Sequence, residues 1–177
     1  MSAQSLGPFF QVAYMVEDID SSVKHWSETV GVGPWTIYRN VGLKARWKGQ
    51  DTDLKINVGL SYRDGLQIEL IQPVSKTISP YQHDDGRIKV GMHHMAWTTK
   101  DFEGAVAKAK AQGLNQVFSA TNSVTQVAYF EAPNEPGVLI ELIEANTDMQ
   151  AGFDQGIAAS RNWDGGERIL MDIDFGG

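Results

Sequence analysis

Phe10-Gln11-Val12-Ala13-Tyr14 returns later in the chain as His93-His94-Met95-Ala96-Trp97, and an acid-rich turn and a helical stretch follow each copy. A second pair of phrases matches in the same way: Gly65-Leu66-Gln67-Ile68-Glu69-Leu70-Ile71 and Gly137-Val138-Leu139-Ile140-Glu141-Leu142-Ile143. These matches predict a fold made of two copies of one unit, whose elements should follow each other in the same order.

Each copy is predicted to form strand, helix, strand, strand, strand. Aspartates precede both helices, where a carboxylate can accept hydrogen bonds from the free N–H groups of the first turn. Asp64-Gly65 indicates a tight hairpin, because this pair supplies the positive φ angles that such turns need. The expected strands span residues 9–16, 35–41, 54–62 and 66–72 in the first copy and 94–99, 115–118, 124–131 and 138–144 in the second.

The chain therefore divides into a first βαβββ module at residues 1–73, a linker at 74–90, a second module at 91–146 and a C-terminal extension at 147–177. The linker is rich in proline, serine, aspartate and glycine, which are turn and loop residues. In the extension, Ile169, Met171, Ile173 and Phe175 occupy every second position, which is the period of a strand. We expect this strand to pack on a sheet edge or across the interface of a homodimer.

The composition excludes several classes of protein. The 177 residues carry a formal net charge of -7, whereas a nucleic-acid binder needs a dominant basic face. No cysteine is present, which excludes disulfides and thiolate metal sites. No apolar run reaches the roughly 18 residues of a membrane helix, and residues 1–6 lack the features of a signal peptide. We expect a soluble cytoplasmic protein without nucleic-acid or membrane partners.

The repeat places four side chains with oxygen or nitrogen donors at matching positions. Gln11 and His94 lie early in the two copies, and Glu69 and Glu141 lie late, inside otherwise apolar phrases. Each of them alone could be a solvent-facing or hydrogen-bonded core residue. Together they are candidate ligands of one divalent metal ion, because a carboxylate on a covered strand needs a partner or a cation. His93 is expected to point to the face opposite His94, as a packed or supporting residue, since side chains alternate along a strand.

Gly91-Met92-His93-His94-Met95-Ala96-Trp97 and Pro136-Gly137-Val138-Leu139-Ile140-Glu141-Leu142 resemble motifs of the vicinal oxygen chelate superfamily, the glyoxalase/bleomycin resistance/dioxygenase fold. The resemblance covers about residues 8–146 and is greatest for the methylmalonyl-CoA epimerase and glyoxalase I families. It implies an α+β fold in which paired βαβββ modules form a cupped, incompletely closed mixed sheet barrel around one divalent metal ion. The chain departs from the epimerase family at Glu69, where that family has Gln.

A site of this kind implies a metal-dependent isomerase or epimerase, which removes a proton next to a carbonyl and passes through a metal-stabilised enolate. The oxygen-rich donor set favours Co, Ni, Mn, Mg or Zn as the ion. Glu141 or Glu69 is the expected catalytic base. Asp53 is a further candidate, in place of the separate glutamate that the resemblance to the epimerase family implies.

Other functions remain open at this point. A glyoxalase-type lyase needs the same donors, an extradiol dioxygenase usually needs two His and one carboxylate, and a binding protein of the same fold could hold a small molecule without reaction. A short basic stretch could bind an anionic or CoA-linked substrate, or it could be a solvated hairpin. It consists of Arg39, Lys44, Arg46 and Lys48.

Overall fold

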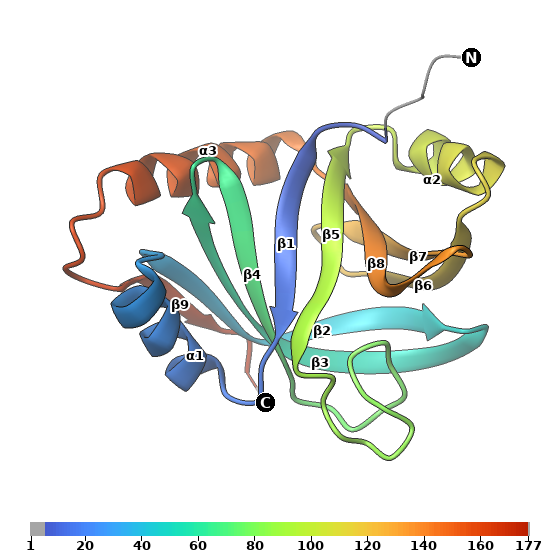
Figure 1. Ribbon diagram of the computed structural model, residues 1–177, viewed down its shortest axis with the longest axis horizontal. Helices are drawn as coiled ribbons and strands as arrows, with labels where there is room; N and C mark the ends of the chain where they lie inside the picture. Colours follow the sequence, from blue (N-terminus) through green and yellow to red (C-terminus); the bar gives the residue numbers. More distant parts are fainter. Residues whose placement is uncertain (1–5, 177) are drawn as a thin grey trace.

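Residues 6–176 are described in the computed structural model (Figure 1), so the first five residues of the expected first module lie outside the described part. The first copy of the repeat forms β1 (Phe9–Met15), α1 (Ile19–His25), a π-helical turn (Trp26–Val30), β2 (Trp35–Trp47), β3 (Gln50–Arg63) and β4 (Leu66–Pro73). The second forms β5 (Gly91–Thr99), α2 (Phe102–Ala111), β6 (Asn115–Thr121), β7 (Gln126–Ala132) and β8 (Glu135–Glu144). After it come α3 (Thr147–Arg161) and β9 (Ile169–Asp174).

Local chemistry sets the ends of these elements. Oδ1 of Asp18 accepts a hydrogen bond of 2.7 Å from the backbone N–H of Ser21, and Asp101 caps α2 in the same way. Asp64 and Gly65 have φ angles of 54° and 86°, which join β3 to β4 by the tight turn expected from their sequence.

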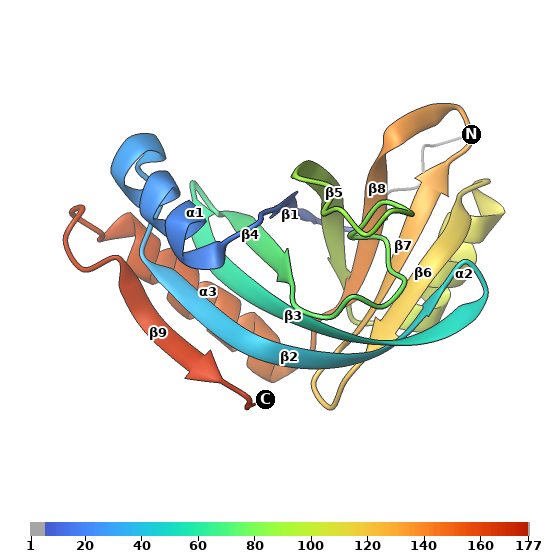
Figure 2. The ribbon, with the colours of Figure 1, turned by 90° about the horizontal axis from the view of Figure 1, so that it is seen from below.

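The strands form a closed barrel, and the expectation of an incompletely closed barrel is wrong. Around the barrel the order is β3-β4-β1-β5-β8-β7-β6-β2, and β2 also pairs with β3. Closure follows from the length of β2 and β3, which continue beyond residues 41 and 54 to a hairpin at their tips. Lys44–Trp47 of β2 thereby reach β6, where they pair antiparallel with residues 118–121. Figure 2 shows β2 and β3 running from the side of α1 across to β6 and α2 of the second copy.

Apolar side chains fill the barrel and also attach the helices to its outside. The interior cluster includes Ala13, Ile56, Phe118 and Tyr129 from four different strands. Outside, α1 packs on the first copy through Ile19 and Val23, and Phe102, Val106 and Ala109 of α2 pack on the second. Among the described residues, no helix is long and apolar enough to span a membrane.

The linker contributes to the barrel interior. Tyr81 is 2% exposed and contacts Phe118 and Tyr129, with ring centroids 6.1 and 6.3 Å apart. In Figure 2 the loop from β4 to β5 lies between β5 and β3. This segment therefore serves as a core element as well as a connection between the copies.

The C-terminal extension lies on the first copy. β9 pairs parallel with β2, and α3 packs on β3 and β1, where Phe153 lies 4.5 Å from Phe10 between ring centroids. Figure 1 shows α3 running along one end of the barrel. Arg39 ties β9 to the body of the protein, because its guanidinium bonds both Asp20 of α1 and Asp172 of β9.

Candidate metal centre

The four candidate ligands come from four neighbouring strands, which follow each other as β4, β1, β5 and β8. An alanine lies between the donors in each copy. Ala13 is paired with Glu69 on one side and His94 on the other, and Ala96 is paired with Gln11 and Glu141. Both alanines are fully buried, so their small side chains leave space among the four donors. The internal repeat thus becomes an approximate twofold arrangement around one point.

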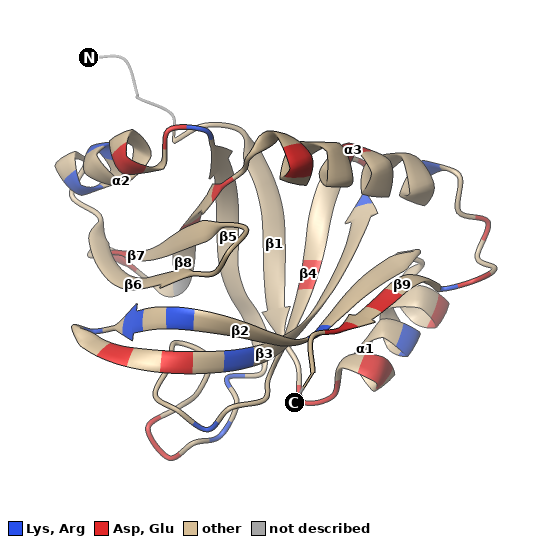
Figure 3. Cartoon of the chain, turned by 180° about the vertical axis from the view of Figure 1, so that it is seen from behind, with Lys and Arg blue, Asp and Glu red and all other residues tan. Residues whose placement is uncertain are grey.

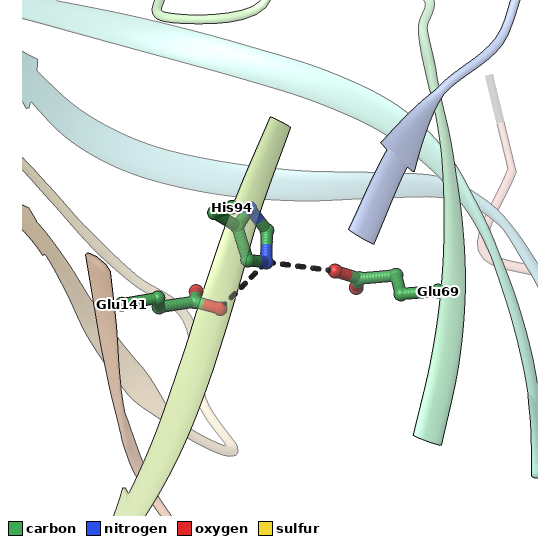
Figure 4. A group of neighbouring side chains, drawn as sticks. All are labelled: Glu69, His94 and Glu141. Atoms are coloured by element: carbon green, nitrogen blue, oxygen red, sulfur yellow. Dashed lines mark ion pairs between the residues drawn. The ribbon is translucent and has the colours of Figure 1, made fainter. Parts of the chain in front are cut away.

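Three oxygen atoms converge on Nε2 of His94. Oε2 of Glu141 lies 2.9 Å away, Oε1 of Gln11 3.1 Å and Oε2 of Glu69 3.3 Å. Figure 4 shows the two carboxylates approaching this nitrogen from opposite sides. A ring nitrogen carries at most one hydrogen, which cannot satisfy three acceptors. The arrangement therefore has more electron-pair donors than hydrogens to share among them, and a bound cation would satisfy these donors.

Burial makes this excess costly. His94 is 0% exposed, and the side chains of Glu141 and Glu69 are 5% and 14% exposed. Oε2 of Glu141 is buried and accepts no hydrogen bond within the described chain, because its contact with His94 is an ion-pair approach rather than a directed bond. Ligand atoms of Glu69, His94 and Glu141 all lie within 4.8 Å of one another. These donors fit a single divalent ion.

The pKa values of His94 and Glu141 in the metal-free centre are shifted by the same burial and the same close contacts. Burial alone would lower the pKa of His94, but the carboxylates of Glu141 and Glu69 outweigh it and raise that pKa to about 10. Burial raises the pKa of Glu141, and the neighbouring imidazole opposes this effect. A proton therefore occupies the centre when no metal ion does, and an ion must displace it.

A chain of amides orients Gln11. Its Nε2 donates to Oε1 of Gln67 over 2.6 Å, and Nε2 of Gln67 donates to the hydroxyl of Tyr62 over 2.6 Å. All three side chains are buried. Because the amide nitrogen of Gln11 is engaged by Gln67, its oxygen is the atom presented to His94 and to a metal ion.

The prediction that His93 points away from His94 is wrong, and a β-bulge is the reason. Ala13 is paired with His94 but Tyr14 with Met92, so His93 is an extra residue without a partner on β1. Its ring turns to the same side as His94, and the two Nδ1 atoms lie 3.0 Å apart. Burial lowers the pKa of His93 to about 3, with a further contribution from His94.

The first copy has an equivalent bulge. Phe9 is paired with Trp97 and Gln11 with Ala96, so Phe10 is the extra residue of β1. Phe10 corresponds to His93 in the repeat, and each directly precedes a candidate ligand. In both copies the extra residue of the bulge therefore directly precedes the candidate ligand, although Phe10 packs on Phe153 and not on its ligand neighbour.

Two tyrosines connect Glu141 with the linker. The hydroxyl of Tyr129 favours the charged form of Glu141 and so opposes the rise of its pKa. The hydroxyls of Tyr129 and Tyr81 lie 3.0 Å apart, and both rings are buried. If Tyr129 donates to the carboxylate, Tyr81 donates to Tyr129, so the linker stabilises the charge of Glu141 through one intermediate group.

Asp53 and the basic residues are not brought to this centre. Asp53 is exposed and pairs with Lys44 at 2.8 Å, while its neighbour Leu54 points into the barrel. Arg46 pairs with Asp51 across the same hairpin. Figure 3 shows these charges along the ends of β2 and β3. The observed environment is thus that of a solvated hairpin.

Several residues of the centre were not predicted from the sequence. Gln67 could have been found, because it lies two positions before Glu69 on the same face of an apolar strand. No sequence signal of this kind distinguishes the three tyrosines, since an aromatic residue in a strand or loop is ordinarily a core residue. They are Tyr62, Tyr81 and Tyr129. Pro80 reaches His93 through its backbone carbonyl, whose oxygen lies 3.2 Å from Nε2 of that ring, and sequence patterns do not reveal such a contact.

Comparison with known proteins identifies the fold. The family model of the glyoxalase/bleomycin resistance protein/dioxygenase superfamily matches residues 10–129. The structure of methylmalonyl-CoA epimerase from Mycobacterium tuberculosis is similar with a TM-score of 0.55 and 19% identity, covering 85% of this chain and 97% of that one. The Streptomyces coelicolor epimerase in complex with 2-nitronate-propionyl-CoA gives 0.54 and 19%, covering 81% and 97%.

A hypothetical protein from Bacillus halodurans C-125 is also similar, with a TM-score of 0.53 and 19% identity over 78% of this chain and 94% of that one. No curated protein matches the chain in sequence. At these identities the structural likeness shows a shared fold, and the chemistry has to be argued from the centre itself.

Proposed function

This chain belongs to the glyoxalase/bleomycin resistance protein/dioxygenase superfamily, and from that premise we propose that it is a divalent-metal-dependent epimerase or isomerase that moves a proton on a carbon next to a carbonyl. One observation carries the proposal. Three oxygens, two of them from the buried residues Gln11 and Glu141, converge on one imidazole nitrogen, and Oε2 of Glu141 accepts no hydrogen bond within the described chain. Such a set is stable only with a cation or an extra proton.

Gln11, Glu69, His94 and Glu141 would hold the ion, with Co, Ni, Mn, Mg and Zn as candidates for this oxygen-rich set. The ion would supply positive charge beside a substrate carbonyl, where negative charge develops when a neighbouring proton is removed. The protein contributes the positions of these donors, because two bulged strands and two amide or imidazole neighbours fix the ligands.

The two glutamates are suited to the proton transfer. Burial raises the pKa of Glu141, which makes it a stronger base than an exposed carboxylate. Glu69 is the more accessible of the two and approaches from the other side. Two carboxylates on opposite sides of one centre suit an epimerase, because one would remove the proton after leaving the ion and the other would return it on the opposite face.

A nearby pocket supports an anionic substrate. It encloses about 540 Å³ and is lined by Trp47, Lys89, His93 and Leu139, among others. None of the four donors lines it, but two of its wall residues adjoin the centre, since Leu139 is paired with His94 and His93 contacts His94. Lys48 and Lys89 lie 4.9 and 5.8 Å from the ring of Trp47. An aromatic surface flanked by two cations suits a CoA-linked substrate, the class that the epimerase neighbours bind.

A glyoxalase-type lyase is the second candidate. Its support is the donor order Gln, Glu, His, Glu along the chain, which resembles that of glyoxalase I. Both reactions begin with removal of a proton next to a carbonyl, so they differ in substrate rather than in the first step.

Proton exchange tests the proposal. The protein is loaded with Co²⁺, Ni²⁺, Mn²⁺ or Zn²⁺, and deuterium uptake from D₂O into 2-substituted acyl-CoA thioesters and hydroxyketones is followed by NMR. We expect one ion per chain and rapid exchange into one substrate class. Glu141→Gln should lower the exchange rate by about 10²- to 10⁴-fold. Glu144→Gln is the matched control, because Glu144 lies on the same strand three positions on and points to the other face.

Two results would contradict the proposal. One is a purified protein that binds none of these ions. The other is a fully loaded protein that exchanges no proton in any of these substrates, which would leave a binding protein of the same fold. Exchange that persists in Glu141→Gln would transfer the role of base to Glu69.

A further inference from the structure

His93 lies where it can control the chemistry of its neighbour. Its ring is buried between Tyr81 and Tyr129, with centroids 5.3 and 5.6 Å away. Both of its nitrogens have a partner: Nε2 lies 3.2 Å from the backbone carbonyl of Pro80, and Nδ1 lies 3.0 Å from Nδ1 of His94. The bulge that creates this contact places two consecutive residues on one side of β5.

The hydrogens of this chain can be placed from its partners. A carbonyl oxygen only accepts, so Nε2 of His93 carries a hydrogen and donates it to Pro80. Two N–H groups cannot face each other over 3.0 Å, so only one of the paired Nδ1 atoms carries a hydrogen. A metal ion needs the lone pair of Nε2 on His94, and a neutral imidazole then keeps its hydrogen on Nδ1. Nδ1 of His93 is the acceptor of that hydrogen.

We propose that His93 is a positioning residue: held by the carbonyl of Pro80, it accepts the Nδ1 hydrogen of His94 and so fixes Nε2 of His94 as the metal-binding atom. The inference rests on the proposed metal centre. The linker then has a second role, because the carbonyl of Pro80, within residues 74–90, sets the tautomer of His94 on β5 through His93. Metal-bound histidines ordinarily donate this hydrogen to a carboxylate, a carbonyl or water. Here the acceptor is the imidazole of His93, whose own orientation is set by the carbonyl of Pro80.

Two variants separate this role from packing. His93→Phe keeps a planar ring but removes the acceptor, and should weaken zinc binding by about 10- to 100-fold. His93→Asn places an amide oxygen near the position of Nδ1 and should bind zinc more tightly than His93→Phe. His83→Phe is the control, because His83 is an exposed imidazole of the same linker. Affinities are measured by competition between the protein and a zinc chelator.

The tautomers are read directly in the parent protein loaded with Zn²⁺, by long-range ¹H–¹⁵N correlation of the histidine rings. We expect zinc on Nε2 and hydrogen on Nδ1 for His94, and hydrogen on Nε2 alone for His93. This spectrum needs no variant, so it decides the matter even where His93→Phe does not fold.

The inference is overturned if His94 binds zinc through Nδ1, or if His93 carries its hydrogen on Nδ1. It is also overturned if both variants bind zinc as the parent does, or if both lose the same affinity. These results leave the proposed reaction intact. Conversely, a protein with the expected spectrum and no proton exchange would contradict only the proposed reaction, and a parent that binds none of Co²⁺, Ni²⁺, Mn²⁺ and Zn²⁺ would overturn both.

Discussion

Replacement of Tyr81 tests whether the linker is part of the barrel core. Its ring is 2% exposed and contacts Phe118, Tyr129 and His93, and its hydroxyl bonds that of Tyr129. Tyr81→Phe removes only the hydroxyl and should cost about 1 kcal/mol of the free energy of unfolding, the net value of one hydrogen bond. Tyr81→Ala also leaves a cavity and should cost about 3–5 kcal/mol, as large aromatic deletions in cores do.

Urea denaturation of the metal-free protein measures both values. With a dependence of about 2 kcal/mol per molar urea, the midpoint should fall by about 0.5 M for Tyr81→Phe and about 1.5–2.5 M for Tyr81→Ala. Ile78→Ala is the control, because Ile78 lies in the same linker and is 50% exposed. Its midpoint should barely move. The reasoning is refuted if Tyr81→Ala is no more destabilising than Ile78→Ala, or if the two Tyr81 variants have the same midpoint.

Three further predictions concern the centre. Zinc affinity should rise with pH, by up to about tenfold per unit between pH 6 and 9, because the ion must displace a proton from His94. Burial lowers the pKa of His94, but the carboxylates of Glu141 and Glu69 outweigh it and raise that pKa to about 10. Chelator competition at several pH values measures the affinity, and a flat profile contradicts the prediction. Gln67→Leu should weaken zinc binding by about tenfold, because Gln11 loses the partner that orients its amide; unchanged affinity would show that Gln11 needs no support. Asp53→Asn should leave proton exchange unchanged and stability within about 0.5 kcal/mol, because Asp53 is exposed and paired with Lys44; lost exchange would restore it as a base.

Much of the architecture could be predicted from the sequence, because the repeat supplies two readings of one pattern. Two copies of strand, helix and three strands were expected, and aspartate caps and the Asp64-Gly65 turn lie where their chemistry requires. The closed barrel was missed because the strand pattern was ended at residue 41. Leu43, Ala45 and Trp47 continue the alternation between charged neighbours and carry β2 to β6.

Other features left no readable mark. The apolar stripe of α3 is limited to Met149, Phe153 and Ile157 among small and polar residues, and no helix was predicted from it. The bulge at His93 defeats the rule of alternation itself, since one inserted residue reverses the face of its neighbour without any change of composition. The sequence could therefore nominate His94 as a ligand but could not show that His93 touches it.

The paired bulges have a consequence for how such a centre can originate and change. In each copy, two consecutive residues combine the extra residue of the bulge with the candidate ligand: Phe10-Gln11 in the first and His93-His94 in the second. A single duplication event copies both residues, so the second copy inherits the bulge together with the ligand position. Later substitutions can then change either residue separately. The extra residue is apolar in the first copy, where Phe10 packs on Phe153, and polar in the second, where His93 contacts His94, so equivalent bulges give the two sides of the centre different chemistry.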